Sequence, residues 1–434
     1  MRQSDARLEA RAVAVATAIP AHVVEAKGHG HAGTAMGLAP FAHVLFQRVL
    51  RHSPADPGWV GRDRVVLSAG HASLLLYVQL YLTGYGLELD DLAASRTLDS
   101  RTPGHPELGH TPGVEMSTGP LGQGVASAVG MALAARKEAA AFFDGAACAG
   151  SDVFDHTVWV IAGDGCLQEG VSAEASSLAG TLGLDNLVLV WDDNGVTIDA
   201  TTQASFREDV RARYRAYGWR VIEADDPNDL DAIEAVLRDA TDRTAAAGRP
   251  TLVALRSTIG APSEKLGGTP AAHAGGFGVD EVAAVKRALG FAPDASLEQL
   301  VEPGVLEYAR GALERGRELQ GDWQSRFDEW QRANSEAAAR WARFRAGGDG
   351  DAARAALEEV AAALPAEGTP FATRKTNGAV IQALTPHTNL WGGSADLAGS
   401  TNVSVPGEAV AADNPRGEFI RFGIREHSMA AILS

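Results

Sequence analysis

The sequence predicts an α/β fold built on a mostly parallel sheet, because short apolar runs alternate with helical or loop stretches over residues 1–285. The runs that we expect to form buried strands are 65–67, 158–162, 187–191, 220–222 and 252–255. Glycine-rich connections cluster at 28–37, 103–124, 163–170 and 260–278. Loops that converge on one sheet edge can hold a large ligand, although loops also simply connect elements.

The chain has 434 residues, which predicts more than one domain. We expect an α/β unit over 1–285, a helical linker over 286–363 and the start of a second α/β unit over 364–434. Glycines at 347–350 predict a flexible point in the linker. Aromatic residues recur there at helical spacing, which favours core packing over a binding surface. They are Trp323, Phe327, Trp330, Trp341 and Phe344.

Two strand-to-turn transitions are expected in the second unit. Residues 389–391 lead into glycines at 392–393, and residues 419–422 lead into Gly423. The sequence then ends within a predicted apolar helix. A unit of this size is too small to bury a sheet covered on both faces, so we expect it to be incomplete.

Composition excludes several classes of protein. The net charge of −17 argues against binding to nucleic acid or an anionic membrane, although a phosphorylated ligand needs only a local positive cluster. No apolar run approaches the ~18 residues of a membrane span. The N-terminal region contains Asp5 and Glu9, which predicts an amphipathic helix rather than a signal peptide. Together these features predict a cytoplasmic protein.

The two cysteines, Cys148 and Cys166, provide no disulfide framework and fit a reducing compartment. Cys166 is interpreted as a small buried residue, with a nucleophilic thiol as the alternative.

The most informative motif is Gly163-Asp164-Gly165, which follows one predicted strand, while Asn194 follows the next. The glycines permit a tight turn before a helix over 169–182. In a right-handed βαβ unit, both turns lie at the carboxyl ends of neighbouring strands, where open α/β sheets bind ligands. One carboxylate and one amide oxygen suit Mg²⁺, which takes its remaining ligands from water and phosphate. The pattern therefore predicts a cation-bridged diphosphate.

Histidines occur repeatedly in loops marked by glycine or proline. Taken singly, each is a surface or structural residue by default. As a group they predict a polar site that handles hydroxyls and phosphate, because imidazole can donate, accept or shuttle protons near neutral pH. Their spacing fits no usual zinc-ligand pattern. They are His31, His71, His105, His110 and His273.

The segment GDGCLQEGVSAEASSLAGTLGLDNLVLVWDDNGVTID resembles transketolase, a thiamine diphosphate-dependent family. The resemblance implies a thiamine diphosphate-binding fold. It also implies that Asp164, Asn194 and the main-chain carbonyl of Val196 hold Mg²⁺, with Ca²⁺ or Mn²⁺ as alternatives. Gly165 and Glu169 would lie beside the cofactor. Glu169 and Glu174 match glutamates proposed to share protons between two active sites; the alternative is that they are solvated or packing carboxylates.

Further segments carry the resemblance. GHAGTAMGLAP implies that His31 contacts substrate, and LSAGHASLLLYVQLYLTGY implies that His71 contacts the cofactor. SRTPGHPE makes His105 a substrate contact, and STGPLGQGVASAVGMALA places Gly119 and Leu121 against the cofactor. RSTIGAPSEKLGGTPAAHAGG implies that His273 contacts both the substrate and the cofactor. The resemblance also implies that His31 and His273 are catalytic.

One departure from the family pattern leaves an alternative open. His29 precedes the expected loop histidine, so the alignment of His31 could slip by two residues, and Ala32 stands where the family has proline.

In the second unit, ATRKTNGAVIQAL implies that Arg374 binds the substrate phosphate, whereas without the resemblance it is a solvated arginine. GGSADLAGST adds Ser400 as a phosphate contact and Asp396 near the cofactor of the partner chain. FGIREHSM implies that Glu426 lies beside N1′ of the aminopyrimidine and is catalytic. Its carboxyl would exchange a proton with the ring, which favours formation of the thiazolium ylid.

The resemblance implies reversible transfer of a two-carbon ketol unit from a ketose phosphate, such as xylulose 5-phosphate, to an aldose phosphate, such as ribose 5-phosphate. It also implies a homodimer whose sites lie between chains. The chain covers about two-thirds of the family's length. Two alternatives stay open: a dihydroxyacetone synthase, and a non-catalytic cofactor-binding fragment or one subunit of a split enzyme.

Overall fold

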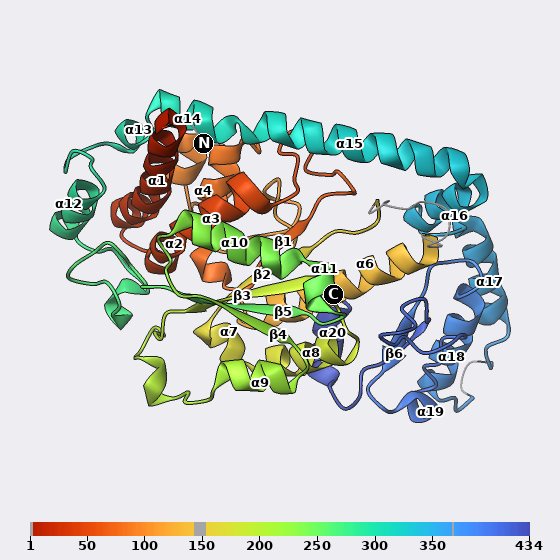
Figure 1. Ribbon diagram of the computed structural model, residues 1–434. Coiled ribbons are helices and arrows are strands. Elements are labelled where there is room, and N and C mark those ends of the chain that lie inside the picture. Colours follow the sequence, from red (N-terminus) through yellow and green to blue (C-terminus); the bar gives the residue numbers. More distant parts are fainter. Residues whose placement is uncertain (1–2, 143–152, 367–368) are drawn as a thin grey trace.

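The computed structural model describes residues 3–142, 153–366 and 369–434. Its centre is a five-stranded sheet in the order β1-β2-β3-β5-β4 (Figure 1). All its strand pairs are parallel, which confirms the predicted α/β class and the position of each predicted strand. The strands are β1 (Arg64–Leu67), β2 (Val158–Gly163), β3 (Leu187–Asp193), β4 (Arg220–Ala224) and β5 (Thr251–Arg256).

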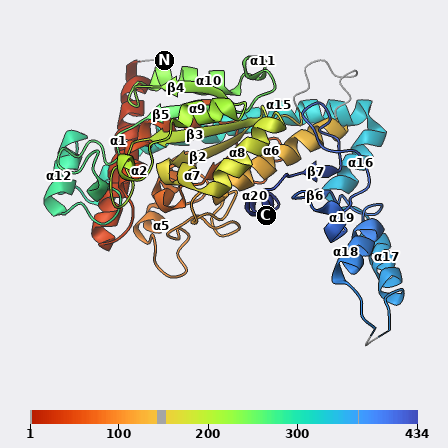
Figure 2. The same ribbon diagram turned by 90° about the horizontal axis from the view of Figure 1, so that it is seen from below.

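Helices cover both faces of this sheet. The connections from β1 through β4 all advance in one direction, so right-handed crossovers place α6 (Gln123–Phe142), α8 (Gly170–Thr181) and α9 (Val210–Ala216) on one face. The step from β4 back to β5 reverses direction and places α10 (Leu230–Thr241) on the other face. Figure 2 shows α6 and α8 on the side of the sheet away from α10. Every residue of β3 is buried as a result.

The predicted N-terminal helix is α1 (Gln3–Lys27), with an acidic residue in its first turn and a basic residue in its last, as the helix dipole favours. None of the described helices is long and apolar enough to cross a membrane. The other short elements of this unit are α2 (Gly33–Gly37), α3 (Ala39–Val44), the π-helix η1 (Leu45–Val49), η2 (Gly70–Ala72), α4 (Ser73–Thr83), α5 (Leu89–Ala93), α7 (Asp164–Gln168), η3 (Thr202–Ala204), α11 (Arg243–Ala246) and η4 (Pro270–Ala272).

The region between the two sheets is helical, as predicted, and the long α15 runs along one edge of the molecule (Figure 1). At the expected flexible point, Gly348 instead pairs with Thr388 in an isolated bridge, and Asp349 caps the next helix by accepting a bond from Ala352. The helices are α12 (Val279–Ala288), α13 (Leu297–Leu300), α14 (Pro303–Arg310), α15 (Ala312–Ala333), α16 (Ser335–Arg345) and α17 (Gly350–Ala362).

The aromatic stripe of the linker is core packing, as predicted. Trp323, Phe327 and Trp330 are buried in a second apolar cluster that also contains Trp59 and Phe154 of the first unit. Trp341 and Phe344 pack against it. The cluster fixes α15 and α16 against the unit that carries the large sheet.

The second sheet has two parallel strands, β6 (Gly392–Ser394) and β7 (Phe419–Arg421), accompanied by α18 (Thr373–Leu384), α19 (Ala398–Thr401) and α20 (Glu426–Ile432). The strand expected at 389–391 was wrong, since β6 begins at the glycines themselves. A Cβ atom at Gly393 would clash with the carbonyl oxygen of Ile420, so only glycine allows this close pairing. The strand expected at 419–422 is confirmed.

Replacing Trp330 by alanine should destabilise the fold. Trp330 is 2% exposed, meets Phe154 edge-on with 4.9 Å between ring centroids and stacks on Phe327. Loss of a buried tryptophan leaves a cavity and costs ~3–5 kcal/mol of unfolding free energy, measurable by urea denaturation. Trp330→Phe is the control and should cost less. Equal stability of Trp330→Ala and the wild type would show that the cluster does not hold the linker.

Candidate active site

A cavity of about 400 Å³ lies where the predicted loops converge, at the carboxyl ends of β2 and β3. His31 lines this cavity and His29 does not, which favours His31 as the loop histidine. The sequence-predicted residues on its wall are His31, His71, His105, Gly119, Leu121, Asp164, Gly165, Glu169, Asn194, Val196 and His273.

The glycines beside Asp164 act differently from the prediction. Neither adopts a positive φ: Gly163 is extended, with φ −94° and ψ 178°, and α7 begins directly at Asp164. A Cβ atom at Gly165 would lie 2.8 Å from Cδ1 of Leu121. A side chain at this position would press on Leu121, so glycine contributes space here rather than a tight turn.

The Asp164 carboxylate is buried and held in place. Its Oδ1 accepts a bond from Nε1 of Trp191 at 3.0 Å, and its Oδ2 accepts one from the backbone N–H of Gly195 at 2.9 Å. Burial raises the pKa of Asp164 to about 6, against the lowering effect of the Trp191 bond. Asp164 has no ion-pair partner within the described residues. A buried carboxylate without a cationic partner is costly, and a bound cation would relieve that cost.

Asn194 is oriented by Asp192, a residue that the sequence analysis missed. The Asn194 amide donates to Oδ2 of Asp192 at 2.6 Å, and its Oδ1 accepts from the backbone N–H of Val196 at 2.9 Å. Asp192 also accepts a bond from Ser257, and burial raises its pKa to about 7. Its position could have revealed it, because Asp192 lies at the carboxyl end of the predicted strand, two residues before the predicted ligand Asn194.

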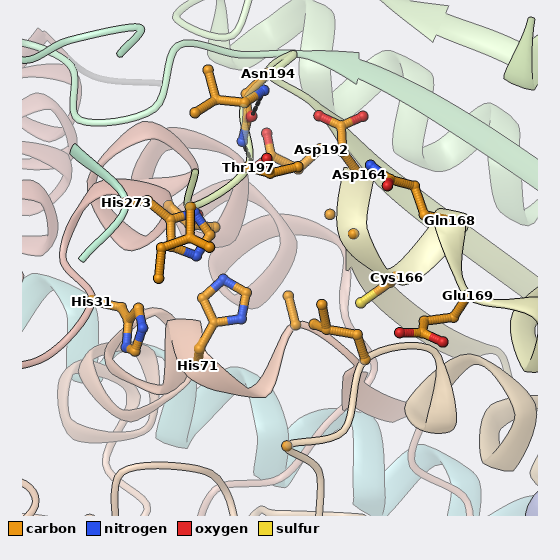
Figure 3. A pocket seen from close by; sticks show the side chains of 18 of the residues that line it. His31, His71, Asp164, Cys166, Gln168, Glu169, Asp192, Asn194, Thr197 and His273 are labelled. Atoms are coloured by element: carbon orange, nitrogen blue, oxygen red, sulfur yellow. Dashed lines mark hydrogen bonds between the residues drawn. The ribbon is translucent and has the colours of Figure 1, made fainter. Parts of the chain in front are cut away.

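Histidines form the opposite wall (Figure 3). The ring centroids of His71 and His273 are 4.8 Å apart, and those of His31 and His71 are 5.2 Å apart. Burial, followed by the neighbouring histidines, lowers the pKa of His71 to about 3. Burial lowers the pKa of His31 to about 4. These imidazoles are neutral near pH 7, so each can donate from one nitrogen and accept at the other.

Two ring nitrogens on this wall have no partner. Nδ1 of His31 and Nδ1 of His273 are buried and make no hydrogen bond within the described residues. Buried polar atoms are nearly always satisfied, so unpaired ones in a cavity indicate places for ligand atoms.

Cys166 lines the cavity but behaves as the expected small buried residue. It is fully buried, the Ser68 hydroxyl donates to its Sγ atom at 3.5 Å, and burial raises the pKa of its thiol. A protonated thiol is a poor nucleophile. Cys148 lies outside the described residues. Gln168 and Thr197 also line the cavity and were not predicted from the sequence.

Four predicted residues of the second unit do not reach this cavity. Arg374, Asp396, Ser400 and Glu426 are exposed, and none lines the cavity of its own chain. Glu174 also lies outside it, where its Oε2 accepts a bond from the backbone N–H of Ser428 at 3.1 Å.

The described residues include no cluster of three or more His, Cys, Asp or Glu side chains with the spacing of a metal site. The predicted ligands are of another kind: one carboxylate, one amide oxygen and one backbone carbonyl. All three residues line the cavity, and oxygens of these kinds are the ligands that a hard cation prefers.

The parallel sheet and the cavity at its strand ends define an α/β ligand-binding protein. Residues 8–349 match the family described as "Transketolase, thiamine diphosphate binding domain". The chain belongs to the transketolase family, as the sequence motifs predicted.

Relatives agree with this assignment. A transketolase of Mycobacterium tuberculosis is 46% identical over 98% of this chain, and the chromosomal transketolase of Cupriavidus necator is 43% identical over 96% of it. The chain spans 61% of the length of each.

A solved transketolase from Pichia stipitis in complex with sedoheptulose 7-phosphate matches with a TM-score of 0.87 and 37% identity, covering 98% of this chain and 62% of its own. The Leishmania mexicana transketolase matches with a TM-score of 0.88 and 36% identity over the same shares. These likenesses confirm the predicted fold.

Stability of the unliganded chain should fall in mild acid because of His71. Below pH ~6.5 the unfolded chain binds a proton at this histidine, whereas the folded chain stays neutral until about pH 3. The unfolded state therefore binds more protons over this range. As a result, the free energy of unfolding falls by ~1.4 kcal/mol for each unit by which the pH is lowered. Urea denaturation at pH 7, 6 and 5 should show a shallower pH dependence for His71→Gln. An unchanged dependence would contradict the neutral state of His71.

Proposed function

We propose that this chain binds thiamine diphosphate and a divalent cation in the cavity and takes part in ketol transfer between sugar phosphates. The observation that carries the proposal is a buried carboxylate without an ionic partner, Asp164, facing a wall of neutral histidines within one cavity. Relatives named transketolase, and a Pichia stipitis structure that contains a sugar phosphate, support it.

Asp164, Asn194 and the carbonyl oxygen of Val196 would hold the cation, for which Mg²⁺ is the proposed identity and Ca²⁺ or Mn²⁺ the alternatives. Asp192 would keep the Asn194 amide turned so that its oxygen stays on the side of Val196. Bound in this way, the cation would neutralise the buried Asp164 carboxylate and attract a diphosphate.

Thiamine diphosphate supplies a nucleophilic carbon when bound, and the protein orients the reactants. We propose that His31, His105 and His273 bind the sugar hydroxyls and that His71 contacts the cofactor. The buried Nδ1 atoms of His31 and His273 are the free positions for such bonds. Because these rings are neutral, they can accept a hydroxyl proton and return it without a prior change of charge.

The reaction would be reversible transfer of a two-carbon unit from a ketose phosphate, such as xylulose 5-phosphate, to an aldose phosphate, such as ribose 5-phosphate. Glu426, Asp396, Arg374 and Ser400 would act on the cavity of a second copy in a homodimer. Their exposure in the single chain supports that arrangement.

Ketol transfer by the 434-residue chain, with thiamine diphosphate, Mg²⁺, xylulose 5-phosphate and ribose 5-phosphate, tests the function. Turnover supports a transketolase, and turnover with formaldehyde as the preferred acceptor would favour a dihydroxyacetone synthase. A folded chain that binds the cofactor without turnover would be a non-catalytic fragment or one subunit of a split enzyme.

Asp164→Ala should abolish cation-dependent binding of thiamine diphosphate, because it removes the buried carboxylate that the cation neutralises. Calorimetric titration with and without Mg²⁺ measures the change. Asp226→Ala is the matched control, since Asp226 is an exposed acid beyond the end of β4 in the same sheet, and should bind as the wild type does. Unchanged affinity of Asp164→Ala would remove the cation assignment.

Two inactive variants should restore activity when mixed if the site is shared between chains. Glu426→Gln should bind the cofactor yet fail to exchange its C2 proton with deuterium, whereas Asp164→Ala should not bind it. A mixed dimer contains one cavity with Asp164 intact and Glu426 supplied by the other chain. Recovered C2 exchange after co-refolding supports a shared site, and no recovery from a confirmed mixed dimer would contradict it.

A further inference from the structure

A recess of about 380 Å³ lies against the proposed cation site and is not used by the proposed function. Its lining includes Asp164 at the end of β2, Trp191 and Asp193 of β3, and Arg211 of α9. Asp164 lines this recess as well as the cavity, so it forms part of the wall between the two spaces. We refer to it as the α9 recess.

Trp191 connects the α9 recess with the cation site. Its backbone is fixed within the sheet, since β3 pairs with β2 on one side and with β5 on the other. Trp191 lines the recess, and its Nε1 donates to Oδ1 of Asp164 at 3.0 Å. A side chain that borders an open space is held less firmly by packing than one enclosed on all sides. Another group must therefore hold the indole if its N–H is to stay on Asp164.

Arg211 is placed to hold the indole. Its Cζ atom lies 5.1 Å from the centroid of the Trp191 ring, within the range of a cation–π contact. Trp191 and Asp193 are two residues apart within β3, so their side chains leave the same face of the sheet. The guanidinium contacts both of them, which ties the ring to the strand end from which Asn194 follows.

Two carboxylates hold the Arg211 guanidinium in place. It donates from Nη2 to Oδ2 of Asp193 at 3.0 Å, and its Nε lies 3.4 Å from Oε1 of Glu223 on β4. Asp193 is buried, so its pair with Arg211 is screened less by water than an exposed pair would be. The donors of a guanidinium lie in its plane and leave its face free for a ring, so one arginine can make all three contacts.

Neutralising Asp193 does not explain Arg211 by itself. Arg256 also pairs with Oδ2 of Asp193, at 3.3 Å, from an exposed position on β5. Among the described residues, however, the cation–π contact with Trp191 is made by Arg211 alone. The contact with the indole is therefore what distinguishes Arg211 from Arg256.

We propose that Arg211 is a positioning residue for the cation site, although it does not line the cavity. It holds Trp191 so that the indole N–H stays on Oδ1 of Asp164. This bond and the one from the Gly195 N–H fix the plane of the carboxylate. Each carboxylate oxygen can accept more than one bond, so positions remain for a cation. The inference rests on the proposed function, since the role that it assigns to Arg211 is in cation binding.

The proposal predicts an effect opposite in sign to that of simple electrostatics. Arg211 is a positive charge near the proposed cation site, so Coulomb's law alone predicts that its removal strengthens Mg²⁺ binding. If Arg211 positions Trp191, its removal weakens Mg²⁺ binding instead, because the Asp164 carboxylate is no longer held in one orientation. The direction of the change therefore separates the two explanations.

Calorimetric titration of the 434-residue chain with Mg²⁺, at a fixed concentration of thiamine diphosphate, measures that direction. Arg211→Ala should bind Mg²⁺ about five- to tenfold more weakly than the wild type, as partial loss of a hydrogen bond to a charged group predicts. Arg211→Lys keeps the charge without the planar group and should lie between the two.

Arg215→Ala is the matched control. Arg215 lies on the same helix, is exposed and is 3.9 Å from Glu223, so its removal also takes one positive charge from α9. Mg²⁺ should bind to this variant as it does to the wild type.

A double-mutant cycle with Trp191→Phe locates the effect. This variant keeps an aromatic ring but lacks the N–H donor, so it should itself weaken Mg²⁺ binding. Adding Arg211→Ala should then cause no further weakening, because the bond that Arg211 supports is already absent. Equal weakening by Arg211→Ala in both backgrounds would overturn the proposal.

Hydrogen exchange at the Trp191 indole tests the positioning without cation or cofactor. Isotope labelling of tryptophan gives separate indole N–H signals by nuclear magnetic resonance, and the signal missing from Trp191→Phe identifies Trp191. Its exchange with solvent should be faster in Arg211→Ala than in the wild type, and unchanged in Arg215→Ala. Wild-type exchange in Arg211→Ala would overturn the proposal.

The two measurements separate this proposal from the proposed function. No Mg²⁺-dependent cofactor binding by the wild type would overturn the proposed function and, with it, the role of Arg211 in cation binding. Normal binding by the wild type, with unchanged or tighter Mg²⁺ binding by Arg211→Ala, would overturn the role of Arg211 alone.

Discussion

The parallel pairing of β2 with β3 is the constraint on which the site depends. It sets Gly163 opposite Asp192, so the first residue of α7 and the last residues of β3 leave the sheet together. Asp164 then lies within hydrogen-bonding distance of Trp191 and Gly195. A shift of one residue in this register would move Asp164 away from Trp191 and Gly195 and break the bonds that hold its carboxylate.

That register also brings acidic side chains together in a buried region. Burial raises the pKa of both Asp164 and Asp192, whereas Asp193, between Asp192 and Asn194, is paired with Arg211 and Arg256. Among the described residues, Asp193 therefore has two arginine partners, whereas Asp164 and Asp192 form no ion pair. Across the cavity the histidines are kept neutral by burial and by one another. This contrast suits the proposed ligands: a cation at one end and hydroxyl groups at the other.

Strong local signals made much of this predictable. Every apolar run assigned as a strand of the large sheet is one. The signal is strongest for β2 and β3, whose residues are almost all buried and whose sequences are accordingly apolar. The loop residues of the cavity followed from strand ends and from family motifs. Asp192 was missed because it reads as part of a polar turn, and its role depends on Ser257 of another segment. The strand β6 was misplaced because its glycines look like a turn until the close approach of Ile420 is known.

The second unit shows why a single chain does not display the whole proposed site. Its helix α20 is tied to the large unit at several points: Ser127 donates to the carbonyl oxygen of Ala431, and Arg425 donates to the Ser177 hydroxyl. The bond between Ser428 and Glu174 adds a third tie beside Glu426 itself. Glu426 nevertheless remains exposed and away from the cavity of its own chain. Bringing it there would break these ties, which is why the proposed function assigns Glu426 to the cavity of a second copy.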